Sequence, residues 1–322
     1  MACKKFLTLN NGLKMPSIGI GTWMAPDHEI EAALDLALKV GYRHIDAAPV
    51  YLNEKAIGRV LKKWLDSNQI KREDLFITTK LPPPANRPSC VEKTLRNSLN
   101  DLQLSYVDMY LIHTPFSVPE TGGDFERDAN GDIVIDPTTD HIEIWKTMEK
   151  MVELGLTKSI GISNFNKKQI QRLLDNSKTK PSNLQIELHL YFQQNELVDL
   201  CKANNIVVTA YSPLGSRGIV DLKKSAGVKC ESINLIENPK VLEIAENHKK
   251  TPAQILLRWI IQRDVCAIPK STNPERLQQN LNIWDFELSN DEMSSLSKLD
   301  KGIRVCDFSF FKGMEKHPEF PW

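Results

Sequence analysis

The feature of this sequence that most constrains its fold is an alternation of short apolar runs with amphipathic segments, repeated along the whole chain. The apolar runs are rich in β-branched residues, which is typical of strands buried on both faces. The segments between them space their apolar residues as one face of a helix does. Eight such units with one extra helix before the last strand predict a (β/α)8 TIM barrel.

The expected strands cover residues 18–23, 42–46, 75–80, 107–113, 157–162, 184–189, 206–210 and 265–268. The expected helices cover residues 28–40, 55–65, 89–102, 142–154, 167–175, 195–203, 239–248 and 252–262, and a last helix opens with Asn273 as N-cap and Pro274. An open doubly wound sheet also alternates strands with helices. The dinucleotide-binding motif of that fold has three glycines, in the pattern G-x-G-x-x-G. Here Gly19 and Gly21 match the first two, but Met24 stands at the position of the third.

The ends of the chain and two long loops depart from this alternation. Residues 6–15 alternate around an Asn-Gly turn and predict a β-hairpin within residues 1–17. Residues 114–140 and 214–236 are expected to be long substrate loops. The C-terminal tail, residues 302–322, is rich in aromatic residues and is expected to lie over the pocket. With no linker composition anywhere, residues 1–322 are expected to form one domain.

Composition excludes several classes of protein. Lysine and arginine total 41, as do aspartate and glutamate, so no global charge attracts nucleic acid or an anionic membrane. The six cysteines are far apart, with neither a disulfide framework nor metal-ligand spacing. No apolar run could span a bilayer. We therefore expect a cytoplasmic protein with no metal, nucleic-acid or membrane partner, and expect it to be a monomer.

Polar and aromatic side chains stand at the ends of the first four expected strands: Trp23, Asp46, Lys80 and His113, with Tyr51 in the loop after the second. In a (β/α)8 barrel these ends meet on the face where active sites form. Lysine near a phenol would favour the phenolate, and aspartate would keep the ammonium charged. A histidine could hold a carbonyl oxygen. Such a set protonates an oxygen without supplying a nucleophile, so it needs a hydride from a cofactor.

The sequence resembles the aldo-keto reductase family over nearly its whole length. Three motifs carry the resemblance: Gly41-Tyr42-Arg43-His44-Ile45-Asp46 through Glu54 and Gly58; Ile160-Gly161-Ile162-Ser163-Asn164-Phe165; and Ile268-Pro269-Lys270-Ser271 with Arg276, Gln279 and Asn280. The resemblance implies that Tyr51 is the catalytic acid, completed by Asp46, Lys80 and His113. It also implies an extended nicotinamide cofactor bound without a dinucleotide-binding fold.

The resemblance assigns the cofactor contacts by position. Tyr211 would stack on the nicotinamide, and Ser163, Asn164 and Gln185 would bind its carboxamide. Ser212, Leu214 and Ser216 would line the pyrophosphate. Lys270 and Arg276 at the start of a helix suit the 2′-phosphate of NADPH. The remaining predicted cofactor residues are Thr22, Trp23, Asp46, Ser271, Thr272, Gln279 and Asn280.

Thr114 departs from the family pattern, in which a large aromatic residue often follows the histidine. We expect a substrate pocket formed by Trp23, Tyr51, His113, Thr114 and Phe116, widened by the small side chain of Thr114. The overall pattern resembles arthropod members of the family, including reductases of 3-keto ecdysteroids such as 3-dehydroecdysone.

These observations predict NADPH-dependent reduction of aldehydes and ketones to alcohols. The expected substrates include bulky steroid-like ketones. The alternative is an NADPH-binding regulatory or structural protein on the same fold, similar to potassium-channel β subunits or lens crystallins.

Overall fold

The computed structural model describes residues 3–120, 125–229 and 233–322. In these residues, eight parallel strands form one sheet, and the order of the strands in the sheet follows their order in the chain. Backbone pairing of Ile18 with Ala267 and of Gly21 with Lys270 joins the first strand to the last and closes the barrel. The predicted (β/α)8 fold is thus confirmed. The strands are β3 (Ile20–Gly21), β4 (His44–Asp46), β5 (Phe76–Leu81), β6 (Met109–Ile112), β7 (Ile160–Ser163), β8 (Asn183–Glu187), β9 (Val207–Tyr211) and β10 (Cys266–Ala267).

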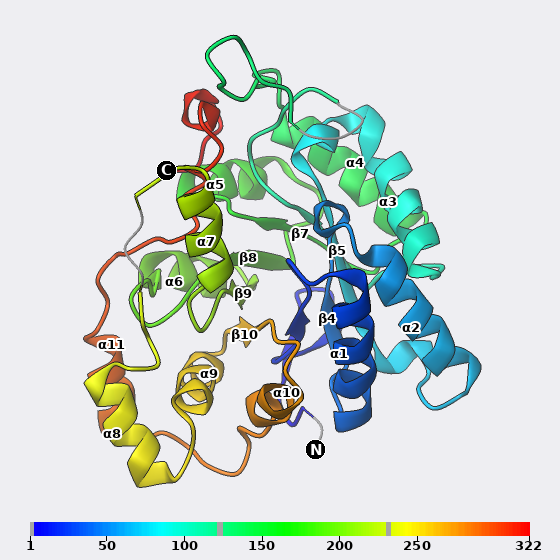
Figure 1. The fold of residues 1–322 in the computed structure, drawn as a ribbon. Helices are drawn as coiled ribbons and strands as arrows, with labels where there is room; N and C mark the ends of the chain where they lie inside the picture. The colour runs from blue at the N-terminus through cyan, green and yellow to red at the C-terminus, as the bar shows by residue number, and fades with distance from the viewer. Residues whose placement is uncertain (1–2, 121–124, 230–232) are drawn as a thin grey trace.

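Helices surround the barrel and cover the outer face of the sheet (Figure 1). The predicted helices are α1 (Asp27–Val40), α2 (Glu54–Asp66), α3 (Pro88–Leu102), α4 (His141–Glu153), α5 (Lys167–Asn176), α6 (Asn195–Ala203), α8 (Pro239–His248), α9 (Pro252–Gln262) and α10 (Pro274–Leu281). Asn273 caps α10 as expected, because its side chain accepts a hydrogen bond from the Arg276 N–H. No helix in the described ranges is long and apolar enough to cross a membrane.

The structure contains two helices that the sequence pattern did not predict. α7 (Arg217–Ser225) lies inside the expected loop 214–236, and α11 (Asn290–Ser297) precedes the C-terminal tail. α7 buries Ile219 and Val220 against aromatic residues of the tail, a contact that local periodicity does not reveal. α11 had a local signal, since Ser289 and Glu292 form a capping box.

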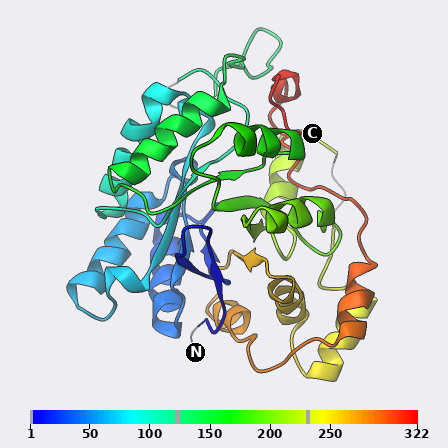
Figure 2. The same cartoon turned by 180° about the vertical axis from the view of Figure 1, so that it is seen from behind.

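The N-terminal hairpin closes the bottom of the barrel. β1 (Phe6–Thr8) and β2 (Lys14–Pro16) pair antiparallel, and Figure 2 shows them in dark blue in front of the strands. Leu7 and Met15 of the hairpin pack against Phe76 and Met109 of the barrel. In the loop 114–140, an isolated antiparallel bridge joins Arg127 to Ile133, whereas Gly122 and Gly123 lie outside the described residues.

His44 is a buried histidine in the barrel wall. Its Nδ1 lies 3.3 Å from the Pro16 carbonyl oxygen, and its Nε2 lies 3.4 Å from the Thr78 hydroxyl. Burial, which disfavours the charged ring, lowers the pKa of His44 to about 4 from 6.5. The unfolded chain therefore binds a proton more readily than the folded chain, so His44 stabilises the fold above pH 6.5 and loses this contribution as the pH falls toward 4.

We predict that His44→Asn reduces the acid sensitivity of the protein. Between pH 7.5 and pH 4.5 the linkage of this one group amounts to about 2.5 kcal/mol of unfolding free energy. Urea unfolding at the two pH values should show that the variant loses about that much less unfolding free energy than the parent when the pH falls from 7.5 to 4.5. His28→Asn, at an exposed position of α1, is the control and should behave as the parent does. Equal losses in all three proteins would show that His44 does not carry this pH dependence.

Candidate active site

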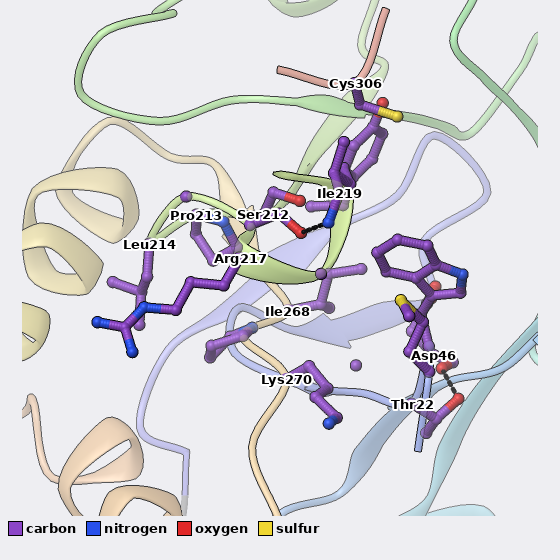
Figure 3. A pocket seen from close by; sticks show the side chains of 18 of the residues that line it. Thr22, Asp46, Ser212, Pro213, Leu214, Arg217, Ile219, Ile268, Lys270 and Cys306 are labelled. Carbon is purple, nitrogen blue, oxygen red and sulfur yellow. Dashed lines mark hydrogen bonds between the residues drawn. The ribbon is translucent and has the colours of Figure 1, made fainter. Parts of the chain in front are cut away.

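A cavity of about 740 Å³ opens at the carboxyl ends of the strands. Its walls are the strand ends, α7, the start of α10 and residues Cys306 to Phe311 of the tail. Figure 3 shows these sides, with Cys306 at the top, Leu214 at the left and Lys270 and Thr22 at the bottom. All of the predicted site residues line this cavity except Lys80, which lies beneath it, and Thr272. The prediction that Thr272 contributes to the site therefore has no support from its position.

Asp46, Tyr51 and Lys80 come together at the base of the cavity. The fully buried Lys80 Nζ donates hydrogen bonds to Asp46 Oδ1 at 2.5 Å, the Ala47 carbonyl oxygen at 3.0 Å and Tyr51 Oη at 3.2 Å. Strands β4 and β5 are paired neighbours in which Asp46 lies opposite Thr78, and Lys80 follows Thr78 by two residues on the same face of β5. A 3-10 turn over Pro49–Tyr51 returns the phenol over the ion pair.

Both carboxylate oxygens of Asp46 are occupied. While Oδ1 accepts from Lys80, Oδ2 accepts from Gln185 Nε2 at 2.7 Å. The Thr22 hydroxyl donates to the Asp46 backbone carbonyl at 2.8 Å. A buried ion pair offsets its desolvation only when its remaining hydrogen-bonding positions are filled. Gln185 therefore supports the ion pair, in addition to its predicted role at the cofactor.

His113 lies beside the phenol, with the two rings edge to face and their centroids 5.8 Å apart. Burial and the positive charge of Lys80 hold the pKa of His113 well below its usual value. The ring is thus neutral at physiological pH and keeps one N–H donor. Its Nδ1 is buried without a hydrogen-bond partner among the described residues. The neutral imidazole is suited to holding a carbonyl oxygen.

Tyr51 does not have the acidity that the sequence suggested. Burial raises the pKa of Tyr51 well above 10, and the negative charge of Asp46 adds to this effect. The prediction that Lys80 makes this phenol more acidic than a free one is wrong in this structure, because burial outweighs the attraction between the ammonium and the phenolate, and Asp46 balances the ammonium charge. Burial also lowers the pKa of Lys80, although Asp46 opposes the shift. The phenol consequently stays protonated, as a proton donor must.

Four of the predicted cofactor residues, Tyr211, Asn164, Ser163 and Gln185, line the cavity together. The Tyr211 hydroxyl, at the end of β9, donates to Asn164 Oδ1 at 2.8 Å, and Asn164 Nδ2 donates to the His113 carbonyl at 3.0 Å. Ser163, the last residue of β7, pairs in register with Gln185 of the neighbouring strand β8. An aromatic ring tied in place beside amide and hydroxyl groups fits a nicotinamide with its carboxamide.

Lys270, four residues before α10, and Arg276, in the first turn of α10, line the cavity and are exposed. Neither forms an ion pair with a residue that the structure describes, so both charges face the cavity uncompensated. Together with the amino end of α10, they fit an anionic group such as a phosphate. Ser216, predicted to line the pyrophosphate, caps α7 and accepts from the Ile219 N–H.

Sequence reasoning missed several residues of the cavity wall: Arg217, Gly218, Ile219 and Leu222 of α7, and Cys306, Phe308, Phe310 and Phe311 of the tail. The sequence marked both segments in outline, as the long substrate loop 214–236 and as an aromatic tail over the pocket, and gave no signal for the individual residues. Thr114 and Phe116 are both on the wall and buried, and the Thr114 hydroxyl donates to the Phe116 carbonyl at 3.0 Å. The described residues contain no group of histidine, cysteine or acidic side chains that could hold a metal ion.

Comparisons with known proteins find a matching family, similar sequences and a similar solved structure. Residues 17–301 match the sequence model of the Aldo/keto reductase family. Aldo-keto reductase family 1 member A1 from Gallus gallus is 45% identical over 300 residues, covering 93% of this chain and 90% of that protein. The Homo sapiens protein of that name is 44% identical over 297 residues, covering 92% and 89%. The solved aldose reductase from Schistosoma japonicum shares 43% identity at a TM-score of 0.90, covering 99% and 98% of the two chains.

We predict that Lys80→Met lowers the unfolding free energy by about 3–5 kcal/mol, because it leaves Asp46 charged and unpaired in the interior. The double variant Lys80→Met/Asp46→Leu removes both charges and should regain much of that loss. Chemical denaturation of the parent, both single variants and the double variant gives the coupling free energy. Simple additivity of the two single effects would show that the ion pair is not coupled.

Proposed function

Because the chain belongs to the aldo-keto reductase family, we propose that it reduces aldehydes and ketones with NADPH, using Tyr51 as the proton donor. Family membership makes the chain an NADP-dependent oxidoreductase that acts on carbonyl groups. The finer assignment depends on one observation above all. The phenol of Tyr51 lies on the wall of the cavity, 3.2 Å from a buried ammonium that is itself paired with a carboxylate.

Tyr211, Ser163, Asn164 and Gln185 would hold a nicotinamide, which when bound would supply the hydride for the carbonyl carbon. The chain supplies the rest. The neutral His113 donates a hydrogen bond to the carbonyl oxygen and orients it toward Tyr51. Tyr51 gives its proton to that oxygen as negative charge develops there, and the Lys80 ammonium stabilises the resulting phenolate. Asp46 keeps Lys80 charged throughout.

We predict that Tyr51→Phe lowers turnover by about 10²–10⁴-fold, the usual contribution of a general acid, and leaves NADPH affinity unchanged. Steady-state kinetics with an aromatic aldehyde and fluorescence titration with NADPH measure the two effects. Tyr106→Phe is the control, because that ring packs against Arg72 away from the cavity. Turnover at the parent rate in Tyr51→Phe would refute the mechanism. NADPH binding without oxidation by any carbonyl in the parent would favour the alternative, a regulatory or structural protein.

The preference for NADPH rests on the uncompensated charges of Lys270 and Arg276. We predict that Lys270→Met weakens NADPH binding by about 1.5–3 kcal/mol, the contribution of a charged hydrogen bond, and leaves NADH binding nearly unchanged. Titration of both cofactors measures this difference, with Lys298→Met at an exposed position after α11 as the control. Equal losses for both cofactors would remove the assignment of Lys270 to the 2′-phosphate.

Bulky apolar ketones, including steroid-like ones such as 3-dehydroecdysone, are the substrates that we assign to the wide part of the cavity. The whole cavity, including the region proposed for the cofactor, measures about 740 Å³, and Phe125, Phe308, Phe310 and Phe311 give its substrate part an aromatic wall. Thr114 leaves open the space that a large aromatic residue would fill.

We predict that Thr114→Trp lowers kcat/KM for a ketosteroid about tenfold more than for a small aromatic aldehyde, because added bulk excludes the larger molecule. NADPH oxidation with ketosteroids, aromatic aldehydes and aldoses in the parent and the variant tests this. A parent that reduces aldoses and not ketosteroids, or equal losses on both substrates, would refute the bulky-ketone assignment.

A further inference from the structure

Glu187, the last residue of β8, is a fully buried carboxylate that the proposed reaction does not use. Its Oε1 accepts a hydrogen bond from the Val305 backbone N–H at 2.9 Å, and its Oε2 accepts one from the Cys306 N–H at 2.8 Å. His189 Nε2, also buried, lies 3.1 Å from Oε1. One side chain of the barrel thus holds two consecutive amides of the C-terminal tail.

These contacts require an acid. An ionised carboxylate only accepts hydrogen bonds, so it can receive both backbone N–H groups and the imidazole donor together. A glutamine of the same shape has one accepting oxygen, and its NH₂ group would face a backbone N–H. One buried tail amide would then have no acceptor, which is costly in the interior.

The segment that Glu187 holds leads directly into the cavity wall. Cys306 lines the cavity, followed by Phe308, Phe310 and Phe311. Phe308 packs edge to face on Phe116 with ring centroids 5.0 Å apart. Directional contacts hold the residues around this segment. The Ile303 N–H donates to the Tyr191 carbonyl at 3.0 Å, and Lys223 pairs with Asp307 at 2.7 Å. Between these two contacts, the hydrogen bonds to Glu187 hold the backbone at the start of the aromatic wall.

Strand β8 connects this anchor to the catalytic centre. Gln185, two residues before Glu187 on the same face of the strand, donates to Asp46 Oδ2 at 2.7 Å. Glu187 is paired in register with Tyr211, whose ring lines the cavity. One strand therefore fixes both the ion pair beneath the phenol and the start of the substrate wall.

We propose that Glu187 is a positioning residue for carbonyl substrates, which fixes the tail so that its aromatic side chains form the wall against which bulky substrates bind. Glu187 takes no part in proton or hydride transfer. This proposal rests on the proposed reductase function.

The first test is Glu187→Gln. The KM for a bulky aromatic ketone should rise about tenfold or more, the equivalent of one lost charged hydrogen bond. kcat and KM for propanal, which is too small to need the wall, should stay within about twofold, and NADPH affinity should not change. A general structural defect would lower kcat for both substrates, so the split between KM and kcat separates the two roles.

A matched pair at Val305 tests the same contact without altering the buried acid. Val305 is not part of the cavity wall, and its N–H is one of the two that Glu187 accepts. Val305→Pro and Val305→Ala both lose the branched side chain, but only proline also loses the N–H. Val305→Pro should reproduce the rise in KM for the bulky ketone, and Val305→Ala should not. This pair decides the matter if Glu187→Gln does not fold.

Hydrogen exchange of the tail amides gives a readout that is independent of turnover. Amides of residues 305–311 should exchange faster in Glu187→Gln and Val305→Pro than in the parent and Val305→Ala. A parent that reduces no carbonyl overturns the proposed function, while the exchange rates still report on the anchor. Unchanged exchange, or equal changes in KM for propanal and the bulky ketone, overturns the positioning role.

Discussion

The buried ion pair between Lys80 and Asp46 is the interaction on which the arrangement of this site depends. An ammonium with no exposed surface would tend to lose its proton, and the carboxylate 2.5 Å away keeps it charged. The charged Lys80 then holds the Tyr51 hydroxyl at 3.2 Å. Gln185 occupies the second oxygen of Asp46, so a residue on the far side of the barrel completes the pair. The hydrogen bonds that stabilise this buried ion pair are therefore the same ones that position the catalytic groups.

The closed barrel explains why these residues can meet. Asp46, Lys80 and Gln185 belong to three different strands, and all lie near the carboxyl ends, which a parallel barrel gathers on one face. The hairpin seals the opposite end, and the tail covers the open one. The same topology places the proton donor and the unpaired cations near α10 at different parts of the cavity wall.

Asp46, Lys80 and His113 could be predicted from sequence, because strand ends can be recognised locally and a parallel sheet brings them together. The capping of α10 by Asn273 was predictable for the same local reason. The helix α7 was not, since Ile219 is buried by tail residues distant in sequence. The direction of the pKa shift of Tyr51 could not be predicted either, because it depends on burial. The same holds for the contact between Glu187 and Cys306, which are 119 positions apart in the sequence. Each of these depends on tertiary packing.

The central claim, that the Tyr51 phenol delivers the proton, is tested most directly by replacing Tyr51 with a ring-fluorinated tyrosine, whose hydroxyl group is retained but more acidic. As the pH rises, kcat/KM for carbonyl reduction should then fall at a lower pH in the variant than in the parent, because the donor must be protonated. NADPH affinity should stay the same. A profile that does not move with the acidity of the phenol would contradict the assignment of Tyr51 as the proton donor.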